Sequence, residues 1–233
     1  MNFTLRIKRQ AAASAKPFWQ EFRYDGEPSD SVAAALRELN ARPSLADAHG
    51  QPADPIAWDC GCCAGKCGAC AMRVNGRTVL ACKAFLGDGS YAVTLEPLSK
   101  FPLVRDLVVD RSVIFENLKK IHLWLNERAK FDERAHELRY QSARCLMCGC
   151  CLEVCPNFSA KGSFSGAAAA VAAFRLLNQE RDSAHRREEV RSYSRTFYAG
   201  CGTSLACEDI CPAGIPVTEL ISRSNAAAVW RRF

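Results

Sequence analysis

Apolar and polar side chains alternate in the first part of the chain with the period of a half-buried β-strand. Residues 3–9 (FTLRIKR) and 18–24 (FWQEFRY) follow this pattern, so the two segments are predicted to pair as a hairpin. A helix is expected to follow, capped by Ser29 or Asp30 and running to about Leu39, because its apolar residues fall on one face.

A second pair of short strands is predicted around a turn near residue 75. Residues 71–74 and 77–81 flank Asn75-Gly76, a dipeptide typical of the type I′ turn that joins antiparallel strands. Residues 92–96 alternate again and add another strand. These strands and the preceding helix predict an α+β domain.

The second half of the chain has a helical period instead. Apolar residues recur at helical spacing in the order Ile114, Leu118, Ile121 and Leu125. An alanine-rich helix is expected at 166–178 and a last helix at 216–230, with charged residues at 180–191 between them. The chain is therefore expected to form an α+β domain at 1–105 and an all-α domain at 106–233.

Fourteen cysteines among 233 residues point to chemistry beyond two ordinary domains. The start of the chain has no apolar segment of the kind that directs secretion, so we expect these thiols in a reducing compartment. Clustered cysteines in such a compartment bind metal or carry out redox chemistry. Metal binding is the first expectation.

The first cysteine group has the spacing C-x4-C-x2-C-x11-C, which binds a 2Fe-2S cluster in plant-type ferredoxins. Its members are Cys62, Cys67, Cys70 and Cys82. A zinc site with four cysteines is the alternative, which the C-x4-C interval and the distant fourth cysteine disfavour. Cys60 and Cys63 are expected to be thiols that do not bind the cluster.

The second group, from Cys145 to Cys155, has the bacterial ferredoxin spacing C-x2-C-x2-C-x3-C before a proline, in which the fourth cysteine binds another cluster. The same run recurs from Cys201 to Cys211, with Ser204 where the second cysteine would stand. Exchange of the fourth cysteines predicts a 4Fe-4S cluster held by Cys145, Cys148, Cys151 and Cys211. Three thiolates suit a 3Fe-4S cluster and remain for the last centre: Cys155, Cys201 and Cys207.

Several features of these groups leave alternatives open or exclude other chemistry. A serine oxygen from Ser204 could bind a fourth iron, so a 4Fe-4S cluster is the alternative at the last centre, and Cys150 has no assigned partner. The histidines lie outside the cysteine groups, which excludes a Rieske centre and indicates ordinary surface or packed residues. No nucleophile with a nearby base and no phosphate-binding loop is recognisable, so no catalytic residue is expected.

Charge and hydropathy limit the partners that this chain can have. The formal net charge of +6 treats every cysteine as neutral, whereas three oxidised clusters with their thiolates would contribute about −6. The holo-protein is thus expected to be near neutral and not to bind nucleic acid. The longest apolar run, 167–177, is too short to span a bilayer, so membrane contact is expected through partners.

Beyond the cysteine spacing, the chain resembles the iron–sulfur subunit of the succinate dehydrogenase and fumarate reductase family over nearly its whole length. The matching segments are 58–62 (WDCGC), 95–98 (LEPL), 101–111 (FPLVRDLVVDR) and 115–117 (FEN). The resemblance implies a β-grasp ferredoxin domain with the 2Fe-2S cluster, followed by a helical ferredoxin domain with the 4Fe-4S and 3Fe-4S clusters. It also implies that a partner flavoprotein subunit with FAD acts on succinate or fumarate, while this chain passes single electrons to or from a quinone.

In that family the last cluster faces a membrane anchor and its quinone. The resemblance therefore implies a peripheral location on the cytoplasmic side of the cell membrane, through an anchor subunit such as a cytochrome b. It implies five quinone-facing residues: Pro156, Asn157, Phe158, Gly202 and Ser204. Ubiquinone-linked members carry tryptophan where Ser159 and Ala160 stand and histidine where Gly202 stands, whereas the cysteine-rich segment 60–63 is more similar to menaquinone-linked members. Menaquinone or another quinone is expected.

Two other functions compete with this hypothesis. A soluble or differently anchored relative would join the same ferredoxin domains to a flavoprotein that reduces fumarate with electrons from a thiol, or reduces another enoate. A zinc-binding interaction or nucleic-acid module is permitted by the C-x2-C pairs and the basic residue count. Identification by co-purification of the proteins that bind this chain would distinguish the first alternative. A colourless protein would support the second.

Overall fold

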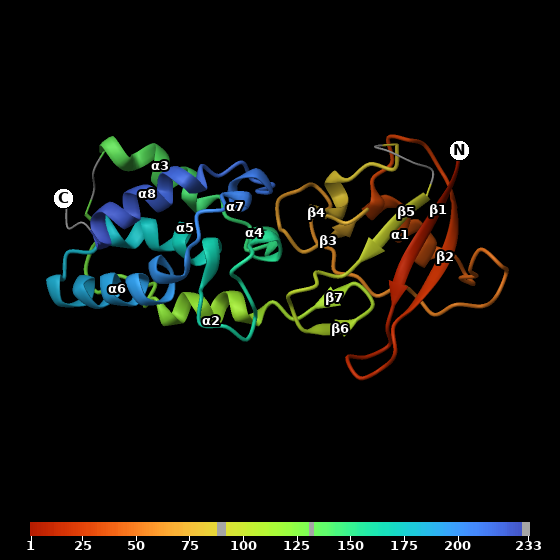
Figure 1. Ribbon diagram of the computed structural model, residues 1–233. Coiled ribbons are helices and arrows are strands. Elements are labelled where there is room, and N and C mark those ends of the chain that lie inside the picture. The colour runs from red at the N-terminus through yellow and green to blue at the C-terminus, as the bar shows by residue number, and fades with distance from the viewer. Residues whose placement is uncertain (88–91, 131–132, 230–233) are drawn as a thin grey trace. The chain divides into compact units, whose positions relative to one another are not determined.

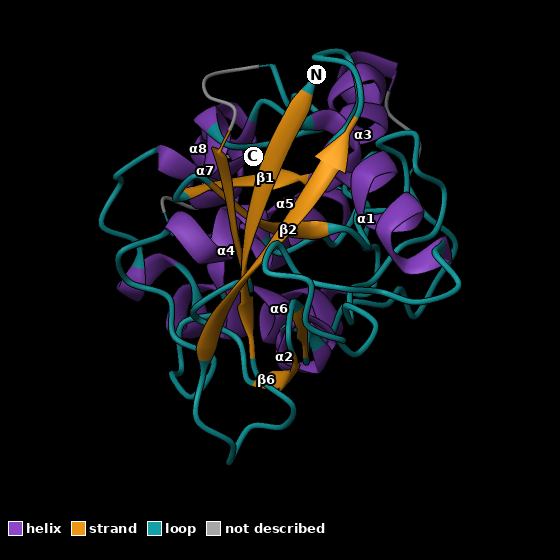
Figure 2. Ribbon diagram, turned by 90° about the vertical axis from the view of Figure 1, so that its right-hand side faces the viewer, coloured by secondary structure: helices purple, strands orange, loops and turns teal. Residues whose placement is uncertain are grey.

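The chain divides into two compact units. The computed structural model describes residues 1–87, 92–130 and 133–229, and the units are Met1–Asp110 (unit 1) and Arg111–Phe233 (unit 2) (Figure 1). Strands dominate unit 1 and helices dominate unit 2 (Figure 2). The α+β fold class expected from the sequence is confirmed.

Unit 1 is organised around a five-stranded mixed sheet in the order β2-β1-β5-β3-β4. The strands are β1 (Asn2–Arg9), β2 (Phe18–Asp25), β3 (Ala71–Val74), β4 (Arg77–Leu80) and β5 (Ala92–Glu96). β1 runs antiparallel to β2 and parallel to β5, and β3 runs antiparallel to β4 and β5. Both predicted hairpins are confirmed, and Asn75 and Gly76 both have positive φ, 50° and 76°, as the type I′ turn requires.

The alternation that predicted β1 also builds the core of unit 1. Phe3, Leu5 and Ile7 are buried, while the residues between them are more exposed. The helix α1 (Val32–Ala41) buries Leu36 and Leu39 on its apolar face. The apolar residues that alternate along β1 and those on one face of α1 are therefore all buried in unit 1.

The start of α1 differs from the expectation by one or two residues. Its N-cap is Ser31, whose side-chain oxygen accepts a hydrogen bond from the N–H of Ala34 at 3.2 Å. The carboxylate of Asp30 is occupied elsewhere, because it accepts hydrogen bonds from the Tyr24 hydroxyl at 2.9 Å and the Glu27 N–H at 2.8 Å. The expectation of Ser29 or Asp30 as the cap was wrong.

A short hairpin that the sequence analysis did not predict completes unit 1. It consists of β6 (Leu103–Arg105) and β7 (Val108–Val109), joined at Asp106. The buried carboxylate of Asp106 accepts hydrogen bonds from the N–H groups of Gln10 at 2.9 Å and Ala57 at 3.0 Å, and it pairs with Arg9 Nε at 3.1 Å. These bonds join the hairpin to β1, and unit 1 accordingly extends to Asp110 rather than residue 105.

The described residues of unit 2 form helices and loops, and none of them forms a strand. Its helices are α2 (Ser112–Lys120), α3 (His136–Ala143), α4 (Cys150–Val154), α5 (Gly166–Leu177), α6 (Ser183–Thr196), α7 (Ala206–Asp209) and α8 (Val217–Ala228). The helix expected to reach Leu125 ends at Lys120, because His122 has a φ of +57° and the N–H of Trp124 turns back to the His122 carbonyl at 2.8 Å. The last helix was expected to end at residue 230, which lies outside the described residues. None of the described helices has the length and apolar character needed to span a bilayer.

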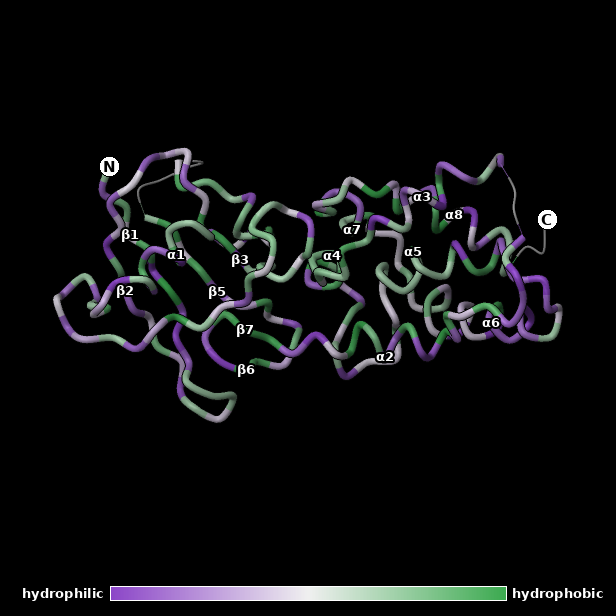
Figure 3. Tube along the Cα trace, turned by 180° about the vertical axis from the view of Figure 1, so that it is seen from behind, coloured by the Kyte–Doolittle hydropathy of each residue, from purple (hydrophilic) through white to green (hydrophobic). Residues whose placement is uncertain are grey.

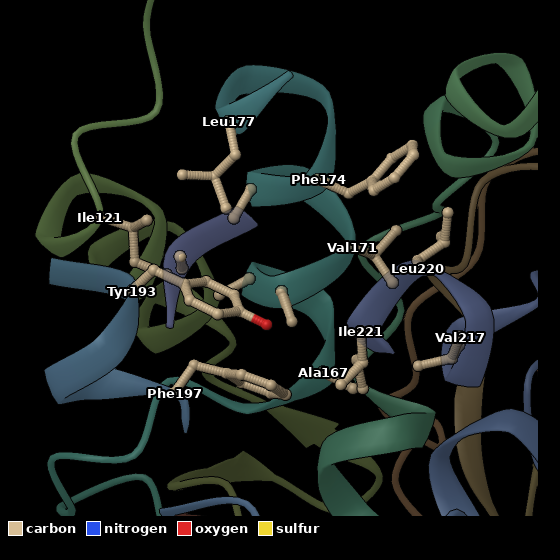
Figure 4. Close-up of a cluster of buried hydrophobic side chains, with 14 of the residues drawn as sticks. Ile121, Ala167, Val171, Phe174, Leu177, Tyr193, Phe197, Val217, Leu220 and Ile221 are labelled. Carbon is tan, nitrogen blue, oxygen red and sulfur yellow. The ribbon is translucent and has the colours of Figure 1, made fainter. Parts of the chain in front are cut away.

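The alanine-rich helix α5 lies at the centre of unit 2. Its small side chains are buried, and the rings of Tyr193 on α6 and of Phe197 directly after α6 pack around it together with Leu220 of α8 (Figure 4). The residues of α5 are mainly hydrophobic, whereas those of α6, which includes most of the charged stretch, are mainly hydrophilic (Figure 3). Because alanine adds little bulk, the neighbouring helices pack closely against α5.

Replacement of Asp106 by alanine is expected to destabilise unit 1 by about 3 kcal/mol, because two partly buried N–H groups would lose their acceptor and the buried Arg9 guanidinium would lose its anionic partner. Chemical unfolding followed by circular dichroism measures the change. The matched control is Asp25→Ala, since the Asp25 side chain is 83% exposed in its ion pair with the N-terminus, and we expect it to cost less than about 0.5 kcal/mol. Equal effects of the two substitutions would contradict the role of Asp106.

Candidate metal centres

The first cysteine group comes together on one loop and the turn that follows β4. The Sγ atoms of Cys70 and Cys82 lie 3.4 Å apart. The N–H of Cys62 points at Cys67 Sγ at 3.4 Å, and the N–H of Gly65 points at Cys82 Sγ at 3.2 Å. The four cysteines predicted to bind the 2Fe-2S cluster therefore share one site.

Backbone N–H groups of this loop favour negative charge on sulfur. The N–H groups of Ala64 and Lys66 donate to Cys62 Sγ at 3.3 and 3.2 Å, and they lower the pKa of the Cys62 thiol to about 7. Burial has the opposite effect at Cys70, where it raises the pKa to about 12. A cation such as iron would overcome that cost, because a coordinating thiol is deprotonated by the metal.

Cys60 and Cys63 differ from the four converging cysteines. Cys60 is exposed and Cys63 is half-buried, and neither takes part in the hydrogen bonds to sulfur that the loop's described residues make. Cys63 has a φ of +49°, so its backbone helps to turn the loop. None of the fourteen cysteines, all of which are among the described residues, is joined in a disulfide bond.

A second site lies where the turn before α4 meets the turn before α8. A small cavity of about 30 Å³ separates the chain segments there. The thiols that line it are those of Cys145, Cys148, Cys151 and Cys211. Three come from the first run and the fourth from the second, which is the exchange expected from the spacing.

The structure shows a neighbour for Cys150, to which the sequence assigned no partner. Its thiol is buried and shares a hydrogen bond with Cys148, which lowers the pKa of Cys148 to about 7 and raises that of Cys150. Burial raises the pKa of Cys145 and Cys151. Cys150 thus favours the thiolate form of Cys148. In the sequence, the unusual feature at this position is that Cys150 directly precedes Cys151.

A third site is a larger cavity of about 230 Å³ lined by Cys155, Cys201 and Cys207. Burial raises the pKa of Cys207 to about 11. The residues expected near the last cluster also line it in part: Pro156, Asn157, Gly202 and Ser204. Phe158 does not line this cavity and is only 3% exposed, with its ring beside Gly166.

The backbone of the third site repeats that of the second. The residues on either side of Cys148 and of Ser204 all have positive φ: Met147 (50°), Gly149 (86°), Thr203 (52°) and Leu205 (59°). The non-glycine residues adopt this conformation despite its steric cost, which indicates that the turn geometry is imposed by the surroundings. Ser204 therefore occupies the same place in its turn as Cys148 in the other.

Comparison with known protein families agrees with this division of the chain. Residues 4–116 match a 2Fe-2S iron–sulfur cluster binding domain. Residues 141–215 match a 4Fe-4S dicluster domain. The cluster domains thus follow in the order in which the sites occur along the chain.

Individual relatives match nearly the whole chain. The succinate dehydrogenase iron–sulfur subunit of Bacillus subtilis is 34% identical over 229 residues, which cover 94% of this chain and 89% of that protein. The fumarate reductase iron–sulfur subunit of Wolinella succinogenes is 31% identical over 237 residues, covering 94% of each. A chain of the Mycobacterium smegmatis Sdh1 complex in the apo form has the same fold, with a TM-score of 0.82, 20% identity and coverage of 99% of this chain and 97% of that chain. The chain belongs to the family of succinate dehydrogenase and fumarate reductase iron–sulfur subunits.

Proposed function

We propose that this chain relays single electrons between an FAD-containing flavoprotein subunit and a membrane quinone in a succinate dehydrogenase or fumarate reductase complex. The observation that carries the proposal is the presence of three separate cysteine sites, in family order, within one chain. Iron–sulfur clusters bound at such sites accept and release one electron at a time. The thiol-linked or enoate-reducing alternative is not favoured, because succinate dehydrogenase and fumarate reductase iron–sulfur subunits match this chain over nearly their whole length.

The donor sets fit the clusters that we assign to them. We assign the 2Fe-2S cluster to Cys62, Cys67, Cys70 and Cys82. We assign the 4Fe-4S cluster to Cys145, Cys148, Cys151 and Cys211. Both sets offer four sulfur atoms in one place, and the N–H groups aimed at sulfur in the first loop suit thiolate ligands.

At the third site we assign a 3Fe-4S cluster to Cys155, Cys201 and Cys207, which are the cysteines among the described residues that line its cavity. Four of the five residues expected to face the quinone line the same cavity, and we retain them in that role: Pro156, Asn157, Gly202 and Ser204. We assign Phe158 to packing, because its side chain is buried and does not reach the cavity. Asn157 Nδ2 donates to the Gly200 carbonyl at 2.6 Å, which holds the two turns together at this site.

The surface beside the third site supports docking to an apolar anchor subunit, such as a cytochrome b with menaquinone or another quinone. Tyr198 is 39% exposed and precedes Cys201, and Leu205 is 44% exposed and lies between Cys201 and Cys207, where it lines the cavity. Large exposed apolar side chains near a cavity mark an interaction surface. Through this anchor the chain would lie at the cytoplasmic side of the cell membrane, and the chemistry on the organic substrate would take place in the flavoprotein rather than in this chain.

Electron paramagnetic resonance (EPR) of the native complex, purified anaerobically, tests the proposed function. We expect a 3Fe-4S signal in the oxidised complex, reduction of the clusters on addition of succinate, and their reoxidation by a menaquinone analogue. Reduction by thiols without any reoxidation by quinone would support the thiol-linked alternative instead. A colourless complex without iron would contradict the relay altogether.

The 2Fe-2S assignment predicts different results for neighbouring cysteines. Cys67→Ser is expected to shift or abolish the 2Fe-2S EPR signal of the reduced protein, because it removes a sulfur ligand. Cys60→Ser is the matched control and should leave the signal unchanged, since Cys60 is exposed and outside the hydrogen-bonded group. Loss of the signal in the Cys60 variant would require a different ligand set.

The third site predicts the outcome of Ser204→Cys. This substitution supplies a fourth thiol in a turn with the backbone conformation found around Cys148, so we expect a 4Fe-4S cluster and an iron content that rises from about nine to about ten atoms per chain. The oxidised 3Fe-4S signal should disappear and the potential should fall. Ser204→Ala is the control and should preserve the 3Fe-4S signal; its loss would show that the serine oxygen is itself a ligand.

A further inference from the structure

A buried cluster of ionisable side chains lies in unit 2 apart from the cysteine cavities. It consists of Glu180, between α5 and α6, and of His185 and Glu189, one turn apart on α6 (Figure 1). The side chains of the three are 0%, 5% and 1% exposed. One donor atom from each lies within 4.8 Å of the other two, and none of the three lines a cysteine cavity.

The distances between these donors suit a single cation in their midst. His185 Nε2 lies 2.9 Å from the Trp124 carbonyl oxygen, 3.5 Å from Glu189 Oε1 and 3.9 Å from Glu180 Oε2. Two ligand atoms at about 2.1 Å from one metal ion are separated by roughly 3.0 Å at a right angle, about 3.4 Å at the tetrahedral angle and about 4.2 Å when opposite. The separations of 3.5 Å and 3.9 Å fall within this range, and the 2.9 Å contact with the Trp124 carbonyl lies just below its lower end.

Glu180 is held in place as a preformed anionic donor. Burial disfavours its charge, but the N–H groups of Asn126, Asp182 and Arg181 donate to its two oxygens at 2.8 to 2.9 Å and lower its pKa. The Trp124 ring stacks on the imidazole of His185 with centroids 5.6 Å apart. Both ligands are therefore oriented by neighbours outside the cluster, as metal ligands usually are.

Glu189 is the unexplained member of the cluster. Neither of its buried carboxylate oxygens has a hydrogen-bond partner among the described residues, and its nearest cationic group is His185 Nε2 at 3.5 Å. Burial raises the pKa of Glu189 to about 7, although His185 and Arg186 favour its charged form. A buried carboxylate without hydrogen bonds is costly unless a cation compensates it.

We propose that Glu180, His185 and Glu189, together with the Trp124 carbonyl oxygen, bind a divalent transition-metal ion of the zinc type, separate from the iron of the clusters. Imidazole and carboxylate donors suit Zn²⁺, and two carboxylates balance its charge. The ion would join the loop after α2 to the segment before α6 and to α6 itself. Its role would be structural, because four protein ligands complete a tetrahedral site.

The competing interpretation of the same contacts is a protonated His185 shared between the two carboxylates without metal. In that state Nε2 would donate to the Trp124 carbonyl at 2.9 Å and would lie 3.9 Å from Glu180 and 3.5 Å from Glu189. Both oxygens of Glu189 would then remain without a hydrogen bond. A metal ion would coordinate Glu189 directly and would satisfy the oxygen that the imidazole does not reach. We therefore favour the metal, and the experiment below distinguishes the two.

The test measures zinc in the complete complex, with all clusters intact. After exposure to a chelator and then to excess Zn²⁺ under anaerobic conditions, we expect one zinc per chain at unchanged iron and sulfide content. Zinc X-ray absorption is expected to show nitrogen and oxygen ligands at about 2.0–2.1 Å and no sulfur at about 2.3 Å, which excludes zinc bound to cysteines. Wild-type protein suffices for this measurement, so the result does not depend on the folding of any variant.

Variants then assign the site to its residues. Glu189→Gln is expected to weaken zinc binding at least 100-fold, since loss of even a supporting residue outside the ligand set costs about 10- to 100-fold. Glu188→Gln is the matched control on the same helix, because the Glu188 side chain is 58% exposed and contacts His122 instead, and it should bind zinc as wild type does. The proposal is overturned if wild-type protein binds no zinc, if the zinc has sulfur ligands, or if the two variants bind zinc equally.

Discussion

Unit 2 depends on the approach of two cysteine-rich turns to the first residues of α5. Ala167 lines the cavity of the third site and Ala168 lines that of the second. A larger side chain at either position would occupy the space in which the sulfurs converge. The alanines of α5 thus allow cysteines some 60 residues apart, such as Cys151 and Cys211, to face one cavity, and the packing of α6 and α8 follows from that arrangement.

In unit 1, cysteines that are apart in the sequence are brought together by the register of two paired strands. Ala71 pairs with Leu80 across the β3–β4 hairpin, and the N–H of Ala81 donates to the Cys70 carbonyl at 3.0 Å. The type I′ turn fixes this register, which brings the sulfurs of Cys70 and Cys82 to 3.4 Å. The loop that carries Cys62 and Cys67 adds N–H groups directed at sulfur, so the site combines a rigid hairpin with a loop of donors.

The buried cluster of Glu180, His185 and Glu189 shows a different use of ionisable groups. The sulfur sites place thiols around cavities suited to clusters, whereas this cluster places two carboxylates and an imidazole within 4.8 Å inside a helical core. Its members lie near the ends of α5 and α6, where the loop after α2 also contributes the Trp124 carbonyl. A metal ion at this point would restrain the loop after α2, the segment before α6 and α6 itself.

The sequence by itself determined the local elements and the chemistry of the cysteine groups. Alternation and the Asn75-Gly76 pair were sufficient for the hairpins, because strand pairing across a two-residue turn is a local property. The spacing of the cysteines divided eleven of them into three predicted sets, and the structure places the members of each set near one another. The family followed from these motifs and from the segments around them.

Only the tertiary structure decided features that depend on contacts between distant residues. The β6–β7 hairpin is held by Asp106 through partners nearly 100 and 50 residues away, Gln10 and Ala57, so no local pattern reveals it. Phe158 follows the cluster motif directly but turns into the core, and Cys150 becomes the hydrogen-bond neighbour of Cys148. His185, expected to be an ordinary histidine, meets two buried carboxylates because α6 and the segment before it fold inward together. Burial and convergence are properties of packing, and the order of residues along the chain does not encode them locally.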